Sequence, residues 1–124
     1  MMKETNVNAP QEVGGPVPTA PGRAALEVSS LSGRPGIRAS GEITVVTRPS
    51  WEEALSELAR NHAGVSYLEL SDVGFVDVAG VTALAITAMN LPDGRVVVEH
   101  PPPHLPRVLE MFWPNLHQIE VAPR

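Results

Sequence analysis

The chain has 124 residues, which is enough for one domain with a sizeable hydrophobic core, and it contains no cysteine. Disulfide frameworks and thiolate chemistry are therefore excluded. The formal net charge is -5, with 14 acidic residues against 9 basic ones, which argues against a nucleic-acid-binding protein. The first residues lack the apolar core of a signal peptide, and no apolar stretch is long enough to cross a membrane. We therefore expect a cytoplasmic protein that does not bind membranes.

Residues 1–23 are predicted to form a disordered leader. This segment is rich in proline and glycine and has almost no large apolar side chains. It cannot bury enough surface to offset the entropy lost on ordering. The folded domain is accordingly expected over residues 24–124.

Two strands are predicted next, over residues 24–31 and 37–46. Both stretches are rich in apolar and β-branched residues, and the segment between them is dominated by turn formers. This arrangement favours a β-hairpin. Gly41 interrupts the second strand and indicates a bulge or a close approach of two backbones.

A helix follows, with its apolar residues on one face at the spacing of helical turns: Trp51, Ala54, Leu55, Leu58 and Ala59. Pro49 suits the first turn, and Ser50 with Glu53 forms a candidate capping box. Glutamates occupy the opposite face, where we expect them to be solvated rather than to act as a general acid–base pair.

The central part of the chain reads as a strand, a polar turn and a second helix. The strand covers residues 65–70, and Ser71 with Asp72 provides the turn. The helix runs from Val78 to Met89 and is apolar on almost every side, so it is expected to be buried on most of its surface. Asp77 stands at the position of its N-cap.

Three more elements are predicted in the C-terminal part. Residues 95–99 contain three consecutive valines, which is typical of a strand in the middle of a parallel sheet. A helix over residues 105–112 and a short strand over residues 118–121 complete the chain. Strands that alternate with helices predict an α/β fold with right-handed crossovers and a mixed sheet.

The segment Phe75-Val76-Asp77-Val78-Ala79-Gly80 resembles the signature of the STAS domain, the module shared by anti-sigma-factor antagonists and the cytoplasmic tails of sulfate transporters. In that family the turn typically reads Asp-Ser-Ser-Gly or Asp-Ser-Thr-Gly, and the first serine is phosphorylated in the antagonists. Asp77 and Gly80 match this pattern, whereas Val78 replaces the serine. The family also often has Gly-Glu-Ile-Asp before its first helix, and here Thr44 stands in place of that aspartate.

The resemblance implies a mixed sheet of four to five strands covered by three to four helices, and a non-catalytic module that binds another protein. The implied partner is an anti-sigma factor or a serine-kinase-like regulator in a partner-switching pathway. Because valine carries no hydroxyl group, control by phosphate at Val78 is expected to be lost. The partner-binding residues carried over from the motif are Thr44, Phe75, Asp77, Val78, Ala79, Gly80 and Val81.

Other functions stay open at this point. A helix N-terminus attracts phosphate, so residues 74–80 could hold a nucleotide or lipid headgroup and make the protein a small-ligand sensor. However, these residues include no Walker lysine, and Asp77 would repel an anion. Asp77 also fits a purely structural role as a helix cap. A scaffold subunit of a regulatory assembly, or a homodimer, is a further alternative.

No catalytic or metal-binding pattern is found in the sequence. There is no nucleophile elbow, no pair of carboxylates in an apolar setting and no cofactor fingerprint. His100 and His104 are separated by three prolines, so they do not share the face of one helix as metal ligands would. We therefore expect no enzyme, metal or cofactor. The large aromatic residues Trp51, Phe112 and Trp113 are expected to pack in or at the edge of the core. Trp113 lies off the apolar stripe of its helix, so an exposed position as an interface anchor is the alternative for this residue.

Overall fold

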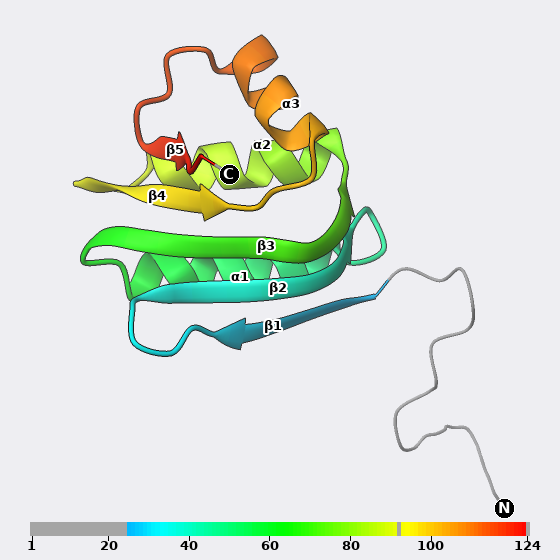
Figure 1. The fold of residues 1–124 in the computed structure, drawn as a ribbon, viewed down its shortest axis with the longest axis horizontal. Helices are drawn as coiled ribbons and strands as arrows, with labels where there is room; N and C mark the ends of the chain where they lie inside the picture. Colours follow the sequence, from blue (N-terminus) through cyan, green and yellow to red (C-terminus); the bar gives the residue numbers. More distant parts are fainter. Residues whose placement is uncertain (1–24, 92, 124) are drawn as a thin grey trace, which may run out of the picture.

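The protein is described here by a computed structural model that covers residues 25–91 and 93–123. The leader predicted over residues 1–23 lies outside these described residues. Over these described residues the chain forms one five-stranded sheet and three helices (Figure 1), which confirms the predicted α/β class. In chain order the elements are β1 Leu26–Ser30, β2 Gly36–Ile43, α1 Arg48–Arg60, β3 Gly64–Val76, α2 Val78–Met89, β4 Gly94–Glu99, α3 His104–Phe112 and β5 Ile119–Val121.

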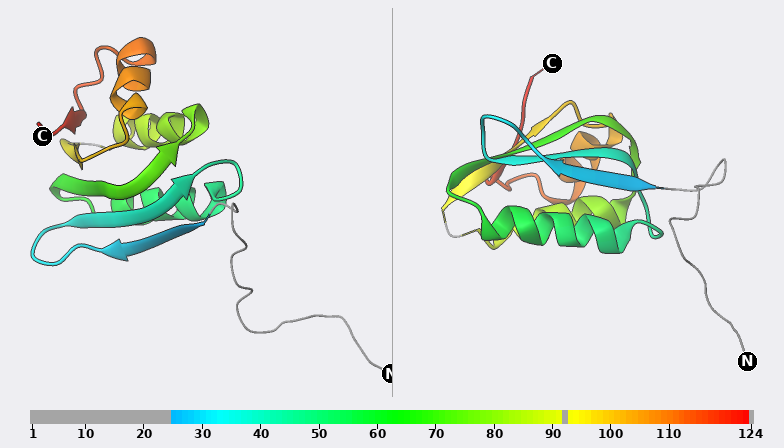
Figure 2. Two further views of the ribbon diagram at one scale, coloured as in Figure 1. Left: turned by 45° about the vertical axis from the view of Figure 1, so that its right-hand side comes forward. Right: turned by 90° about the horizontal axis from the view of Figure 1, so that it is seen from below.

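The strands lie in the sheet in the same order as in the sequence. β1 is antiparallel to β2, as the predicted hairpin requires, and β2 to β5 are parallel to one another. Each helix joins two neighbouring parallel strands, and right-handed crossovers then place the helices on the same face. Figure 2 shows α1 and α2 side by side on this face, with α3 next to α2.

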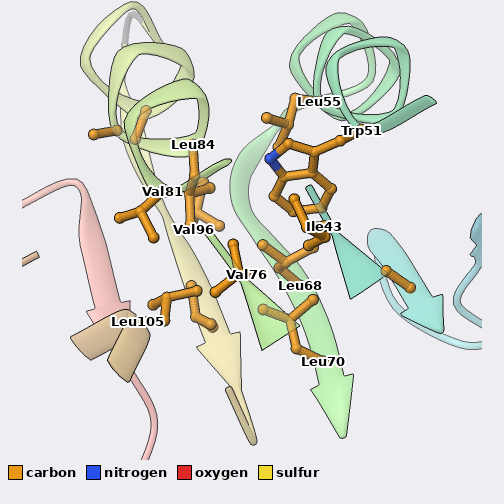
Figure 3. Packing of buried hydrophobic residues seen from close by; sticks show 14 of the residues in the cluster. Ile43, Trp51, Leu55, Leu68, Leu70, Val76, Val81, Leu84, Val96 and Leu105 are labelled. Atoms are coloured by element: carbon orange, nitrogen blue, oxygen red, sulfur yellow. The ribbon is translucent and has the colours of Figure 1, made fainter. Parts of the chain in front are cut away.

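The hydrophobic core lies between the sheet and the helices (Figure 3). The apolar stripe predicted for α1 is buried, with Trp51 fully enclosed. The three valines of β4 are also buried, as expected for a strand inside a parallel sheet. All three helices contribute to the same cluster, whose fully buried larger members include Ile43, Leu55, Leu68, Leu70, Val76, Val81, Leu84, Val96 and Leu105.

The predicted polar turn at Ser71 and Asp72 is wrong, because β3 continues through both residues to Val76. Pairing with β2 is maintained across this region, where Asp72 lies opposite Ser40. Two irregularities in the β2–β3 register absorb the extra residues of β3. The polar side chains therefore mark a bulged stretch of a long strand.

The end of β2 and the start of α1 also differ from the prediction. β2 ends at Ile43 instead of residue 46, and residues 44–47 form a turn. Helix α1 has Thr47 as its N-cap, so Ser50 lies inside the first turn and the predicted capping box with Glu53 does not form. The Thr47 hydroxyl instead donates to the Glu42 carbonyl oxygen at 2.8 Å, which holds the turn against the end of β2.

Helix α2 is less buried than its apolar sequence predicts. The side of α2 that faces away from the sheet carries Val78, Ile86 and Met89, which are all exposed. The fold has only two layers, so no element described in residues 25–91 and 93–123 covers this side. Phe112 is likewise exposed, contrary to the core position expected for it, whereas Trp113 is partly buried against the core.

The face of the sheet opposite the helices is covered by polar side chains. The Arg34 guanidinium makes two hydrogen bonds to the Glu99 carboxylate, one of them at 3.0 Å, and lies 4.5 Å from the centre of the Tyr67 ring. Glu69 is only 6% exposed, and its carboxylate lies 3.0 Å from Nδ1 of His100. These interactions bridge β4, β3 and the β1–β2 turn on this face.

Stability is expected to fall in acid through Glu69. Burial acts to raise the pKa of Glu69, but hydrogen bonds from the amide and hydroxyl of Ser71 and from His100 outweigh it and hold the pKa below its ordinary value of 4.5. Since the pKa is lower in the folded than in the unfolded chain, the unfolded chain binds the proton more tightly. This stabilisation is present above pH 4.5 and is lost as the pH falls through the folded-state pKa.

Urea denaturation measured from neutral pH down to pH 3 checks this prediction. The free energy of unfolding of Glu69→Gln should fall less steeply with acid than that of the wild type. Glu52→Gln, on the solvated face of α1, serves as the control and should follow the wild-type curve. Identical slopes for Glu69→Gln and the wild type would contradict the assignment.

Candidate functional site

The residues that the sequence singles out meet where β2 and β3 end. The turn of residues 44–47 follows β2, and Phe75 to Asp77 lead from β3 into α2. The amide of Asp77 donates to the carbonyl oxygen of Ile43 at 2.9 Å, which joins the two segments. Because β2 and β3 are neighbouring parallel strands, their carboxyl ends meet at the same edge of the sheet.

Asp77 is the N-cap of α2, as predicted from the sequence. Its backbone is extended, with φ −84° and ψ 173°, and its carboxylate accepts a hydrogen bond from the Gly80 amide at 2.7 Å. The carboxylate also lies at the positive end of the helix dipole. Asp77 therefore fixes the point at which α2 begins.

Replacing Asp77 with alanine should lower the free energy of unfolding by about 1 kcal/mol, because the Gly80 amide loses its partner. Asp77→Asn retains a side-chain acceptor and should cost much less. Chemical denaturation of the two variants gives the comparison. Equal losses for both variants would show that the negative charge, and not the cap hydrogen bond, stabilises the helix.

Two of the seven residues expected to contact a partner lie beneath the surface. Val81 is fully buried, and Gly80 is buried where α2 packs on the ends of β2 and β3. The Gly80 carbonyl oxygen accepts a hydrogen bond at 2.9 Å from Nε1 of Trp51, which is also buried. Gly80 and Val81 thus shape the site from below and do not present side chains to a partner.

Apolar side chains are exposed on both segments of the site. Phe75 is 43% and Val78 50% exposed, and Val45 and Val46 in the neighbouring turn are 68% and 69% exposed. The ring of Phe75 also lies 5.3 Å from that of His104, at the start of α3. We call the exposed or half-buried residues of the two segments the partner surface: Thr44, Val45, Val46, Phe75, Asp77, Val78 and Ala79.

Val45 and Val46 are not among the residues predicted to contact a partner, because their β-branched side chains favour a strand over residues 37–46. The available signal is the pair of threonines around them, since hydroxyl side chains stabilise turns. The Val46 amide donates to the Thr44 hydroxyl at 3.2 Å, and the Thr44 amide donates to the Thr47 hydroxyl at 2.9 Å. These bonds hold the turn in a shape that keeps both valines in solvent.

The chemistry of the partner surface suits a protein contact better than an anion. The surface contains five apolar residues and one carboxylate, that of Asp77, and no basic residue belongs to it. The Gly80 amide, which could otherwise bind phosphate at the helix N-terminus, is already bonded to Asp77. An exposed apolar patch of this kind is typical of protein interaction sites.

The histidines serve local contacts in the part of the chain that the structure describes. His62 lies 2.6 Å from the Ser66 hydroxyl, and His100 pairs with Glu69. Among residues 25–91 and 93–123, no group of three or more His, Cys, Asp or Glu side chains could hold a metal ion. None of the helices described over the same residues is long and apolar enough to cross a membrane.

The sheet order and the capped turn before α2 define an α/β domain of the STAS type. A protein-family model described as "Mlab, STAS domain" matches residues 26–113, and the chain therefore belongs to this STAS family. The structure is similar to the crystal structure of an anti-sigma factor antagonist from Mycobacterium paratuberculosis, with a TM-score of 0.57 and 25% sequence identity. That similarity covers 84% of this chain and 91% of the other. The comparison with curated protein sequences gives no match.

Proposed function

We propose that this chain is a non-catalytic interaction module that acts like an anti-sigma-factor antagonist in a cytoplasmic partner-switching pathway. Its partner would be an anti-sigma factor or a serine-kinase-like regulator. Membership of the STAS family and the similarity to an anti-sigma factor antagonist support this proposal. The observation that carries it is the exposed apolar pair Phe75 and Val78 beside the capped start of α2.

We further propose that binding is not controlled by phosphate at the site used in related antagonists. Val78 stands at the position of the phosphorylated serine and has no hydroxyl group. A phosphate there would add about two negative charges and repel a partner. The two nearby hydroxyl groups make local hydrogen bonds, since Thr82 donates to the Val78 carbonyl oxygen at 2.9 Å and Thr44 accepts from the Val46 amide. The module would therefore bind its partner constitutively.

Capture of partner proteins with the purified chain, comparing the wild type with Val78→Asp, tests the proposal. The aspartate would bury an unpaired carboxylate in an apolar contact, so binding should weaken at least about tenfold. A further carboxylate in the first turn of α2 favours the helix dipole, so the fold should be retained. Val78→Ala keeps the site uncharged and should retain most of the binding.

Capture of the same partners by wild type and Val78→Asp would show that the partner surface is not the binding interface. A ligand-sensing or scaffolding role would then replace the proposed one. Kinase-dependent phosphate on Thr44 or Thr82 would contradict constitutive binding, and mass spectrometry of the chain incubated with the captured kinase measures it directly.

A further inference from the structure

β1 is an edge strand with little protection against pairing with another chain. Within the described part of the chain it pairs only with β2. Its sequence, Leu-Glu-Val-Ser-Ser, contains no proline or lysine, and its register with β2 has no bulge. Natural edge strands commonly carry such features to prevent unwanted pairing. The opposite edge strand, β5, has only three residues.

The hydrogen bonds at the two ends of the hairpin show which main-chain groups of β1 face outward. Ala25 accepts from the Glu42 amide at 2.8 Å, and the Leu31 amide donates to Gly36 at 3.0 Å. In an antiparallel pair, residues alternate between bonding the neighbouring strand and pointing away from it. The odd-numbered residues of β1 therefore bond β2. The outward N–H and C=O groups belong to Leu26, Val28 and Ser30.

The side chains of the same three residues line a groove beside α1. The groove has a volume of about 390 Å³, and its floor includes Ile37 of β2 and Ala54 of α1. The groove exists because α1 packs mainly against α2 and β2. The helix therefore leaves the inner face of β1 partly uncovered, and Val28 is 38% exposed. Figure 2 (right) shows β1 in front, with α1 running below it on the helical side of the sheet.

One wall of the groove is acidic. Glu53 and Glu57 lie one turn apart on α1, and both line the groove and are exposed. Glu57 also accepts a hydrogen bond from Arg60 at 2.6 Å. No lysine or arginine is among the described residues that line the groove. An occupant with apolar and basic side chains would complement both the floor and the wall.

We infer that β1 accepts an extended segment of a partner protein as an additional strand of the sheet. Main-chain hydrogen bonds would form with Leu26, Val28 and Ser30, and alternate side chains of the segment would enter the groove. These inward side chains would be apolar over the floor and lysine or arginine beside Glu53 and Glu57. A second copy of the chain fits less well, because pairing β1 with β1 brings two acidic walls together.

This docking edge shares no residue with the partner surface at residues 44–46 and 75–79. The probe is a short synthetic peptide in which every second residue is threonine and the residues between are valine, valine and lysine. A control peptide has glutamate in place of the lysine. NMR on the full chain measures amide shifts and hydrogen exchange. The outward amides of Leu26, Val28 and Ser30 should exchange rapidly in the free chain and slow down with the lysine peptide. The glutamate peptide should bind at least about fivefold more weakly.

Two substitutions separate the main-chain and charge contributions. Val28→Pro removes an outward N–H group without removing a bond to β2, and it should weaken binding at least about tenfold while the hairpin is retained. Glu53→Lys should weaken binding of the lysine peptide and strengthen that of the glutamate peptide. Glu52→Lys makes the same charge change on the same helix, outside the groove, and should leave both affinities within about twofold of the wild type.

Three results would overturn the inference. The first is the absence of peptide-induced shifts on β1, or shifts confined to the partner surface. The second is equal affinity for the two peptides with equal effects of Glu52→Lys and Glu53→Lys. The third is slow exchange of the outward β1 amides before any peptide is added, which would show that another segment of this chain, or a second copy, already occupies the edge. Dependence of that protection on protein concentration distinguishes these two occupants.

Discussion

Trp51→Ala is expected to lower the free energy of unfolding by about 3–5 kcal/mol. Trp51 is the largest fully buried side chain, and it fills the space between α1, α2 and the sheet (Figure 3). Its removal leaves a cavity that the surrounding side chains can fill only in part. It also leaves the Gly80 carbonyl oxygen without the hydrogen bond from Nε1. Guanidinium denaturation followed by circular dichroism measures the loss.

Trp51→Phe separates these two causes. Phenylalanine keeps most of the apolar volume but cannot donate to Gly80, so we expect a loss of about 1–3 kcal/mol from the missing hydrogen bond and the smaller ring. Met111→Ala, at an exposed position of α3, should change stability by less than about 0.5 kcal/mol. If Trp51→Phe were as unstable as Trp51→Ala, the hydrogen bond and not the packing would dominate.

Gly80→Val is expected to cost about 3 kcal/mol. A Cβ atom on Gly80 would lie 2.6 Å from Cγ2 of Ile43 and 2.9 Å from Cγ2 of Val76, and both neighbours are buried, branched side chains that cannot move aside. Either α2 must shift away from the ends of β2 and β3, or the core must rearrange. Thermal and chemical denaturation detect the loss of stability. Since the same shift displaces the start of α2, partner capture should weaken as well.

The matched control is Ala79→Val, one residue earlier in the same helix and only half-buried. It also places a β-branched valine in the first turn of α2, but without the close contact, and should cost less than about 1 kcal/mol from the lower helix propensity of valine relative to alanine. Similar losses at the two positions would mean that a valine side chain in the first turn of α2 is unfavourable in general, and that contact with Ile43 and Val76 does not explain the effect. The glycine of the STAS-type turn would then not be required by packing.

Elements with a clear local pattern could be predicted from the sequence. The apolar stripe around Leu55, the hairpin before it and the three valines of β4 each have one arrangement that buries their apolar side chains. The structure has all three as expected. The N-cap at Asp77 follows from its short carboxylate side chain at the start of an apolar run, and it is also present.

Features that depend on tertiary pairing could not be predicted in this way. The continuation of β3 through Ser71 and Asp72 depends on bulges in its pairing with β2, and local polarity there favours a turn. The exposure of Ile86 and Met89 depends on the number of layers in the fold. The sequence pattern of one helix gives no information on that number.

The candidate site was predicted in outline from the resemblance to the STAS signature. Asp77 and Val78 lie where that signature places them, at the start of α2. The resemblance does not distinguish residues that face solvent from residues that hold the turn, so it predicts a contact for Val81 although this side chain is buried. The exposure of Val45 and Val46 is not predicted, because β-branched side chains favour a strand locally, whereas hydrogen bonds made by the Thr47 hydroxyl end β2 before them.

The pairing of Arg34 with Glu99 links the β1–β2 hairpin to the centre of the sheet. Arg34 belongs to the β1–β2 turn, its guanidinium lies over Tyr67 of β3, and its partner carboxylate is at the end of β4. The β1–β2 hairpin is thereby linked across β3 to β4, with which it forms no strand pair. Opening the hairpin alone requires the loss of the Arg34–Glu99 ion pair. The amides of β1 that are bonded to β2 should therefore exchange with solvent through the same cooperative opening as those of β4. Edge and centre of the sheet would then unfold as one unit.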